Sequence, residues 1–199
     1  MDSYEECLKT FKDPEMCRFG QRAVQLVEAL RLEECLERHK PQKCLDVCLK
    51  NCKEKNCRDL CLSAMDMAAA KGLARRLVQG AIDVASDAGV AIPEAVAIGF
   101  YMLLNEPNDD CIAKIISMRV LGLVAVELRR LLGMKDLLLL LAPTIAMAYE
   151  CIGDDAFSLL DTLAPTIGQE TAERIAAALE EGIVKIGNIE LKFPPVKPT

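Results

Sequence analysis

Apolar residues recur at three- and four-residue intervals along most of the chain, which is the spacing of amphipathic helices. The clearest case is the stretch 23–38, in which this spacing places the apolar side chains on one buried face. Proline, glycine and acidic residues at suitable places suggest where helices begin and end. Helices are predicted up to residue 11, from 13–14 onward, and over 23–38, 44–52, 57–80, 81–88, 93–105, 108–132, 135–151, 154–163 and 169–186.

The C-terminal segment has a different pattern. Residues 188–193 alternate apolar and polar side chains, which is typical of a β-strand, and the prolines that follow cannot continue regular pairing. No partner strand is evident in the rest of the sequence. We therefore expect an extended Pro-rich tail, which either packs on its own chain or docks as an arm on another subunit.

A change in composition near residue 62 divides the chain. Eight of the ten cysteines and the only histidine precede it, and an Ala/Leu/Ile-rich sequence follows. The sequence thus predicts an all-α protein in three parts. These are a cysteine-rich region of helical hairpins (1–62), an apolar multi-helix bundle (63–187) and the extended tail or arm (188–199).

Five cysteines fall within eighteen residues, and their spacing suggests how they pair. Residues four apart on a helix have Cβ atoms about 5–6 Å apart, which is too far for a disulfide. Neighbours such as Cys48 and Cys52 are therefore poor partners within one helix. A turn at 53–56 would instead place Cys52 opposite Cys57 and Cys48 opposite Cys61. The Cys-x3-Cys spacing resembles the helical hairpins of oxidised mitochondrial intermembrane proteins, although their twin motifs lie much farther apart.

The other cysteines fit the same interpretation. Two more pairs bracket predicted turns, namely Cys7 with Cys17 and Cys35 with Cys44. The last two, Cys111 and Cys151, either form a long-range bridge or remain buried thiols, with the bridge favoured.

A metal centre is the alternative for the cysteine cluster. Four thiolates from Cys48, Cys52, Cys57 and Cys61 could bind zinc, Cu(I) or an iron–sulfur cluster. Zinc sites generally use Cys-x2-Cys spacing, and a metal would leave the other N-terminal cysteines unexplained. Disulfide staples are therefore preferred, and no cofactor is expected. A thioredoxin-type redox site lacks its Cys-x2-Cys motif.

Signals of other chemistry are weak. The sequence contains no phosphate-binding loop, dinucleotide fingerprint or nucleophile elbow, and His39 lies in a polar segment. A ligand-binding or enzymatic site around carboxylates in apolar helices is a weaker alternative. These carboxylates are Asp66, Asp83, Glu127, Glu150 and Asp161. Arg119 and Glu127 are predicted to form an ion pair.

Nucleic acid is a partner that is not favoured. Only two basic pairs, at 75–76 and 129–130, could contact phosphates.

Charge and composition bear on location and role. The net charge of −6 disfavours nucleic acid and anionic membranes. No signal peptide is recognised, and the longest uncharged run, Leu137–Tyr149, is too short to span a bilayer. Many cysteines without a secretory signal, together with few Asn and Gln residues, suggest a hyperthermophile or its virus. We expect a cytoplasmic or virion-borne, non-enzymatic structural protein that assembles with itself, such as a capsid or nucleoprotein subunit.

Overall fold

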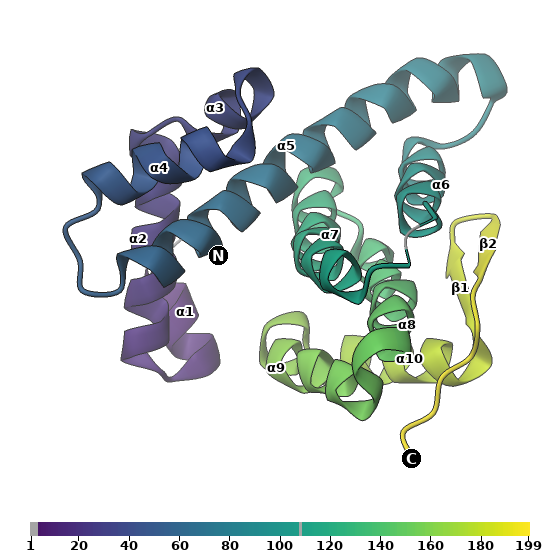
Figure 1. The fold of residues 1–199 in the computed structure, drawn as a ribbon. Helices are drawn as coiled ribbons and strands as arrows, with labels where there is room; N and C mark the ends of the chain where they lie inside the picture. Colours follow the sequence, from purple (N-terminus) through teal and green to yellow (C-terminus); the bar gives the residue numbers. More distant parts are fainter. Residues whose placement is uncertain (1–3, 108) are drawn as a thin grey trace. The chain divides into compact units, whose positions relative to one another are not determined.

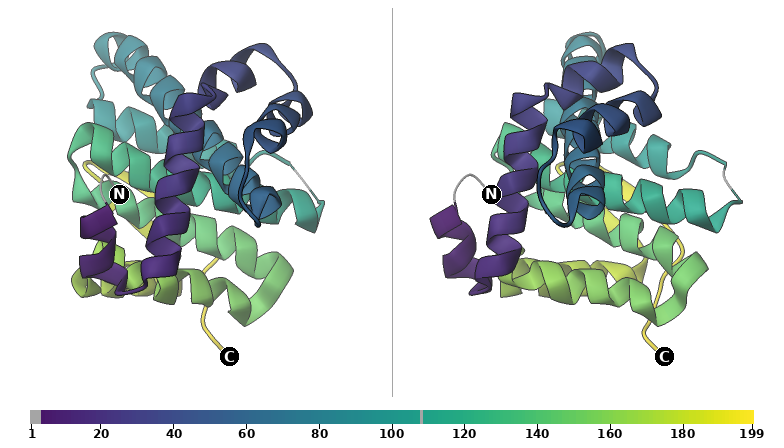
Figure 2. Two further views of the ribbon diagram at one scale, coloured as in Figure 1. Left: turned by 90° about the vertical axis from the view of Figure 1, so that its left-hand side faces the viewer. Right: turned by 60° about the vertical axis from the view of Figure 1, so that its left-hand side comes forward.

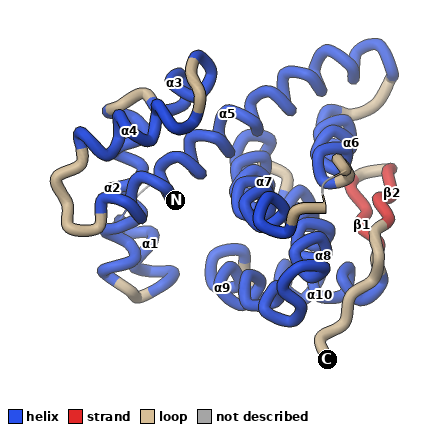
Figure 3. The backbone as a smooth tube through the Cα atoms, viewed as in Figure 1, coloured by secondary structure: helices blue, strands red, loops and turns tan. Residues whose placement is uncertain are grey.

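The computed structural model describes residues 4–107 and 109–199 and is 78% helical, which confirms the all-α prediction (Figures 1 and 3). The chain forms two compact units. Unit 1 ends at Gly72, and unit 2 comprises Leu73–Thr199. The boundary lies inside helix α5 (Cys57–Ala88) rather than near residue 62, and the C-terminal tail belongs to unit 2.

Unit 1 is a set of short helices joined by tight turns. Asp13 caps α2, because its carboxylate accepts hydrogen bonds from the backbone N–H groups of Glu15 (2.9 Å) and Met16 (3.1 Å). Helices α1 and α2 lie side by side (Figure 2). The helices are α1 (Tyr4–Phe11), α2 (Pro14–Ala29), α3 (Leu32–Arg38), α4 (Pro41–Asn51) and the first part of α5.

The single helix predicted over 23–38 is wrong. The chain breaks between α2 and α3, where Arg31 adopts a left-handed backbone conformation (φ 50°). The break lets Leu32 enter the core of unit 1, where it is fully buried. That core is small and combines apolar side chains with half-cystines. Its buried members are Ala23, Val27, Leu32, Cys48, Leu60, Cys61, Ala64 and Ala68.

Unit 2 is built around α8, which packs against α6, α7 and α10. Helix α7 begins after Asp110, whose carboxylate accepts a hydrogen bond from Ile112 N–H (3.0 Å); Asn108, the predicted start, lies outside the described residues. The elements after α5 are α6 (Ile92–Leu104), α7 (Cys111–Leu132), the 3-10 turn η1 (Lys135–Leu140), α8 (Leu141–Ile152), the 3-10 turn η2 (Gly153–Phe157), α9 (Ser158–Ile167), α10 (Gln169–Glu181), β1 (Ile183–Ile186) and β2 (Ile189–Lys192).

The structure also differs from the prediction over 57–88 and over 135–151. Residues 57–80 and 81–88 form one continuous helix, α5, which Gly80 does not interrupt. The helix predicted over 135–151 begins with the tighter turn η1, in which Leu137–Leu140 are all buried. Both differences concern helix continuity, which the apolar spacing does not determine.

The C-terminal strand has a partner that the sequence analysis missed. Helix α10 ends at Gly182 (φ 71°), and β1 then pairs antiparallel with β2, so the helix predicted to residue 186 is wrong. The tail continues along its own unit, because Phe193 N–H donates to the Gly182 carbonyl (2.9 Å) and Val196 N–H to that of Leu179 (2.8 Å). The tail thus packs on its own chain, which is the first of the two placements expected from the sequence.

One apolar segment of unit 2 passes the length and hydropathy criteria for a membrane span. It is Lys135–Phe157, which comprises η1, α8 and η2. However, 61% of its most apolar window is buried inside the protein. Such burial is expected of a core helix in a compact domain.

Candidate functional site: the start and outer face of helix α7

All ten cysteines form disulfides, and the five pairs are those favoured from the sequence. The Cα–Cα distances lie between 5.5 and 5.8 Å, within the normal range. Four bridges clamp the turns of unit 1, and the fifth joins α7 to α8. The pairs are Cys7–Cys17, Cys35–Cys44, Cys48–Cys61, Cys52–Cys57 and Cys111–Cys151.

The four cysteines of the metal alternative, Cys48, Cys52, Cys57 and Cys61, are used in two of these bridges. Metals bind the thiolate, which a disulfide does not provide. A metal site at these positions would therefore belong to a reduced form of the chain. Within residues 4–107 and 109–199, no group of three or more His, Cys, Asp or Glu side chains is arranged to hold a metal ion.

The other sequence candidates are dispersed. His39 is exposed at the end of α3, with its Nδ1 3.4 Å from Lys43 Nζ. Glu127 forms a two-point ion pair with Arg130 (2.6 and 3.0 Å) on α7. The five carboxylates lie on four different helices. Asp66 and Asp83 are on α5, Glu127 on α7, Glu150 on α8 and Asp161 on α9.

Helix α7 carries apolar residues on two opposite faces. Its inner face, which includes Leu121, Val124 and Leu128, is buried in unit 2. On the other side, Ile112 is 71% exposed and Ile116 is 52% exposed. A helix that is apolar on both sides is normally covered on both.

We call this second side the outer face of α7 and define it by five residues. Successive residues are about 100° apart around a helix, so these five lie within about 60° of arc. Three are exposed and apolar, and two are exposed arginines. The five residues are Ile112, Ile116, Arg119, Leu123 and Arg130.

The outer face is not evident from the sequence alone. Apolar residues in α7 recur in two registers, and spacing alone does not tell which register faces the core. The sequence did contain a signal: Ile112, Ile116 and Leu123 are in excess of what a single buried stripe requires.

The charge of α7 is opposite to that of the unit around it. The helix contains Lys114, Arg119, Arg129 and Arg130 against the single acid Glu127. Unit 2 as a whole has 11 Lys and Arg against 17 Asp and Glu. The helix therefore carries a net positive charge within an otherwise acidic unit, although Lys114 and Arg130 are each paired with a glutamate.

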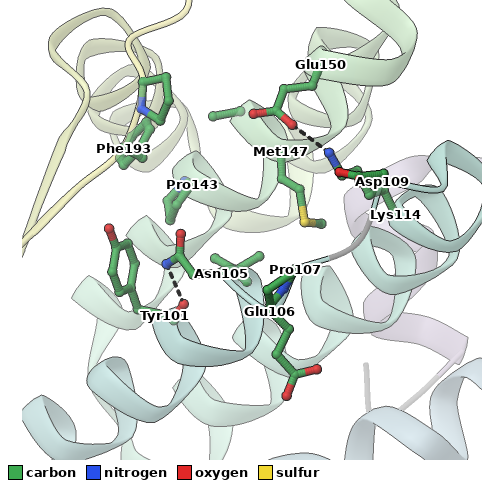
Figure 4. Close-up of a pocket in the computed structure, with 13 residues that line it drawn as sticks. Tyr101, Asn105, Glu106, Pro107, Asp109, Lys114, Pro143, Met147, Glu150 and Phe193 are labelled. Carbon is green, nitrogen blue, oxygen red and sulfur yellow. Dashed lines mark hydrogen bonds and ion pairs between the residues drawn. The ribbon is translucent and has the colours of Figure 1, made fainter.

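A pocket of about 280 Å³ lies beside the start of α7 (Figure 4). The ends of α6 and α8, the first turn of α7 and the tail line it, and the hydroxyl of Tyr101 donates to the Lys192 carbonyl. Met147 and Phe193 contribute apolar surface. An ion pair between Lys114 and Glu150 (2.8 Å) forms one side, as Figure 4 shows.

The hydrogen bond to Glu150 raises the pKa of Lys114 above its ordinary value. Partial burial opposes this rise in the pKa of Lys114, and the charges of Glu150 and Asp109 add to it. Lys114 therefore stays protonated near neutral pH and acts as a fixed cation instead of a base or nucleophile. The described lining residues include no Ser, Thr, Cys or His.

Similarity to known proteins assigns this chain to no family. Comparison of the sequence with protein-family models, with curated proteins and with solved structures gave no match.

Proposed function

We propose that this protein is a non-enzymatic structural or interaction protein that associates with further copies of itself through the outer face of α7. The observation that carries the proposal is the exposure of Ile112 and Ile116 on a helix whose opposite face is already buried. The residues of the pocket beside α7, by contrast, suggest no reaction.

The apolar part of the outer face would stabilise a complex. Fully burying an isoleucine side chain contributes about 1.5–3 kcal/mol. Ile112 and Ile116 are 71% and 52% exposed, so covering both would contribute about 3 kcal/mol before the costs of association. A partner with an apolar surface would provide that gain, whereas one that offers only phosphates would not.

Charge favours another copy of the chain as this partner. The outer face presents Arg119 and Arg130, the latter paired with Glu127 of the same helix, whereas unit 2 apart from α7 is strongly acidic. The basic face of one copy therefore complements the acidic surface of the next, and such complementarity orients and accelerates association. Contact between different surfaces of identical chains is heterologous and produces rings or filaments.

A subunit of a larger assembly in a hyperthermophile or its virus is one form of this proposal. Five disulfides support it, because intracellular proteins of hyperthermophiles are often rich in disulfides. The disulfides would keep the helices of unit 1 in place without a large core.

The test compares Ile116→Glu with Ser117→Glu. Both substitutions add one negative charge at exposed, adjacent positions of α7, but only the first lies on the outer face. The oligomeric mass is measured by light scattering after size exclusion over a range of protein concentrations. We expect the wild type and Ser117→Glu to exceed the 21.8 kDa monomer, and Ile116→Glu to weaken association at least ~10-fold.

Salt gives a second measurement. Raising the ionic strength from about 0.1 M to 1 M should weaken association, since the screening length falls from about 10 Å to 3 Å. A wild type that remains monomeric at all concentrations would refute the proposal. Equal behaviour of the two variants would exclude the outer face as the contact, and a shift in mass only with added nucleic acid would identify a different partner.

A further inference from the structure

The bridge Cys111–Cys151 differs from the other four disulfides in its accessibility. Cys111 is the only one of the ten cysteines that is exposed, and Cys151 is partly exposed. In contrast, Cys48 and Cys61 are both fully buried in the core of unit 1. Because exchange requires a thiolate to reach a sulfur atom, exposed disulfides are the labile ones.

The position of this bridge is also distinct. Cys111 is the first residue of α7 and immediately precedes Ile112, the most exposed residue of the outer face. Cys151 lies at the end of α8, next to Glu150, which pairs with Lys114. Two links thus hold the start of α7 to the end of α8 within one helical turn: a covalent bond and an ion pair.

We propose that Cys111–Cys151 is a redox-responsive bond that controls the start of α7, while the buried bridges of unit 1, Cys7–Cys17 and Cys48–Cys61, are permanent staples. The reductant is a dithiol. Regulation of self-association by this bond rests on the proposed function above, whereas its selective reduction does not.

The exchange takes place in two steps. A thiolate of the dithiol attacks the accessible Cys111 sulfur, the S–S bond breaks, and Cys151 leaves as a thiolate that takes a proton from water. The second thiolate of the reductant then attacks the reductant sulfur of the mixed disulfide, and Cys111 leaves as a thiolate that also takes a proton from water. The cysteines gain two electrons and become two thiols, and the dithiol is oxidised to a disulfide.

Reduction would leave the ion pair between Lys114 and Glu150 as the remaining link at this end of the helix pair. Exposed ion pairs are weak, so the first turn of α7 would fray more readily. Fraying would displace Ile112 from the outer face and so weaken contact with another copy.

The first experiment measures the order of reduction. The oxidised protein is treated with increasing dithiothreitol under native conditions, free thiols are alkylated, and each cysteine is quantified by peptide mass spectrometry. We expect Cys111 and Cys151 to be labelled at least ~10-fold faster than Cys48 and Cys61. Simultaneous labelling of all five pairs, or earlier labelling of the buried pair, would overturn the proposal.

The second experiment measures the effect on association. The double variant Cys111→Ser/Cys151→Ser should lower the oligomeric mass as selective reduction of the wild type does. The control, Cys52→Ser/Cys57→Ser, removes a partly exposed bridge of unit 1 and should leave the mass unchanged. If reduction is selective but association is unaffected, regulation by this bond is refuted. If the oxidised wild type does not associate at all, the proposed function fails while the labile bond stands.

Discussion

Replacing Gly187 by alanine tests whether the C-terminal hairpin is held by a carboxylate from a distant helix. Gly187 lies in the β1–β2 turn with φ 60°, a left-handed conformation that costs an L-residue about 1–2 kcal/mol. An alanine Cβ would also overlap the side chain of Glu94, approaching its Cγ to 2.9 Å and its Cδ to 3.0 Å. Glu94 is 8% exposed and accepts a hydrogen bond from Asn188 N–H (2.7 Å).

Displacing the Glu94 carboxylate breaks its hydrogen bond with Asn188 N–H. Hydrogen bonds to charged groups contribute about 1.5–3 kcal/mol, so the total cost of Gly187→Ala should be about 4 kcal/mol. Gly133→Ala is the matched control in the same unit. Gly133 has nearly the same φ (65°) but open space at the Cβ position, so its cost should be only about 1–2 kcal/mol.

Urea unfolding followed by far-ultraviolet circular dichroism measures this difference. An excess of about 2–3 kcal/mol in Gly187→Ala over Gly133→Ala corresponds to a midpoint lower by about 1 M, given a typical slope of about 2 kcal/mol per M. In a Glu94→Ala background the excess should disappear, because the overlapping side chain is gone. Equal costs for the two glycine variants in the wild-type background would refute the role of Glu94.

Two further predictions concern charge and covalent state. Because the pKa of Lys114 is raised in the folded protein, its contribution to stability is present below the unfolded-state pKa and is lost as the pH rises through the folded-state value. Lys114→Met should therefore reduce the loss of urea stability as the pH rises above about 10, whereas the exposed Lys135→Met should not; identical profiles would contradict the ion pair with Glu150. The intact mass should lie about 10 Da below that of the fully reduced chain, as five disulfides require, and a retained zinc or copper mass would contradict them.

The cysteine pairing shows what local sequence can predict. In unit 1 the partners are 5 to 13 residues apart, so a helical period and the place of one turn suffice to bring them together. The bridge between Cys111 and Cys151 spans 40 residues, and the sequence favoured it only by elimination. The geometry of the first four is a property of helix and turn, whereas that of the fifth depends on how α7 packs against α8.

The candidate site was less predictable. The spacing of Ile112, Ile116 and Leu123 is visible in the sequence, but their exposure is decided by α7 packing through its other apolar face. The pairing of Lys114 with Glu150 joins residues 36 positions apart and likewise depends on that packing. The carboxylates in apolar stretches suggested a shared site, but the structure places them on four different helices.

The sequence by itself determined the helical class, most helix positions and the turns that the cysteines of unit 1 bracket, because these depend on contacts between residues close in the chain. Tertiary structure decided that Ile183–Ile186 is a strand, that the tail packs on its own unit, and which face of α7 is left exposed. The physical reason is burial. An apolar residue gains the same free energy against any apolar surface, so the sequence specifies that it is to be covered, and only the packed fold specifies by what.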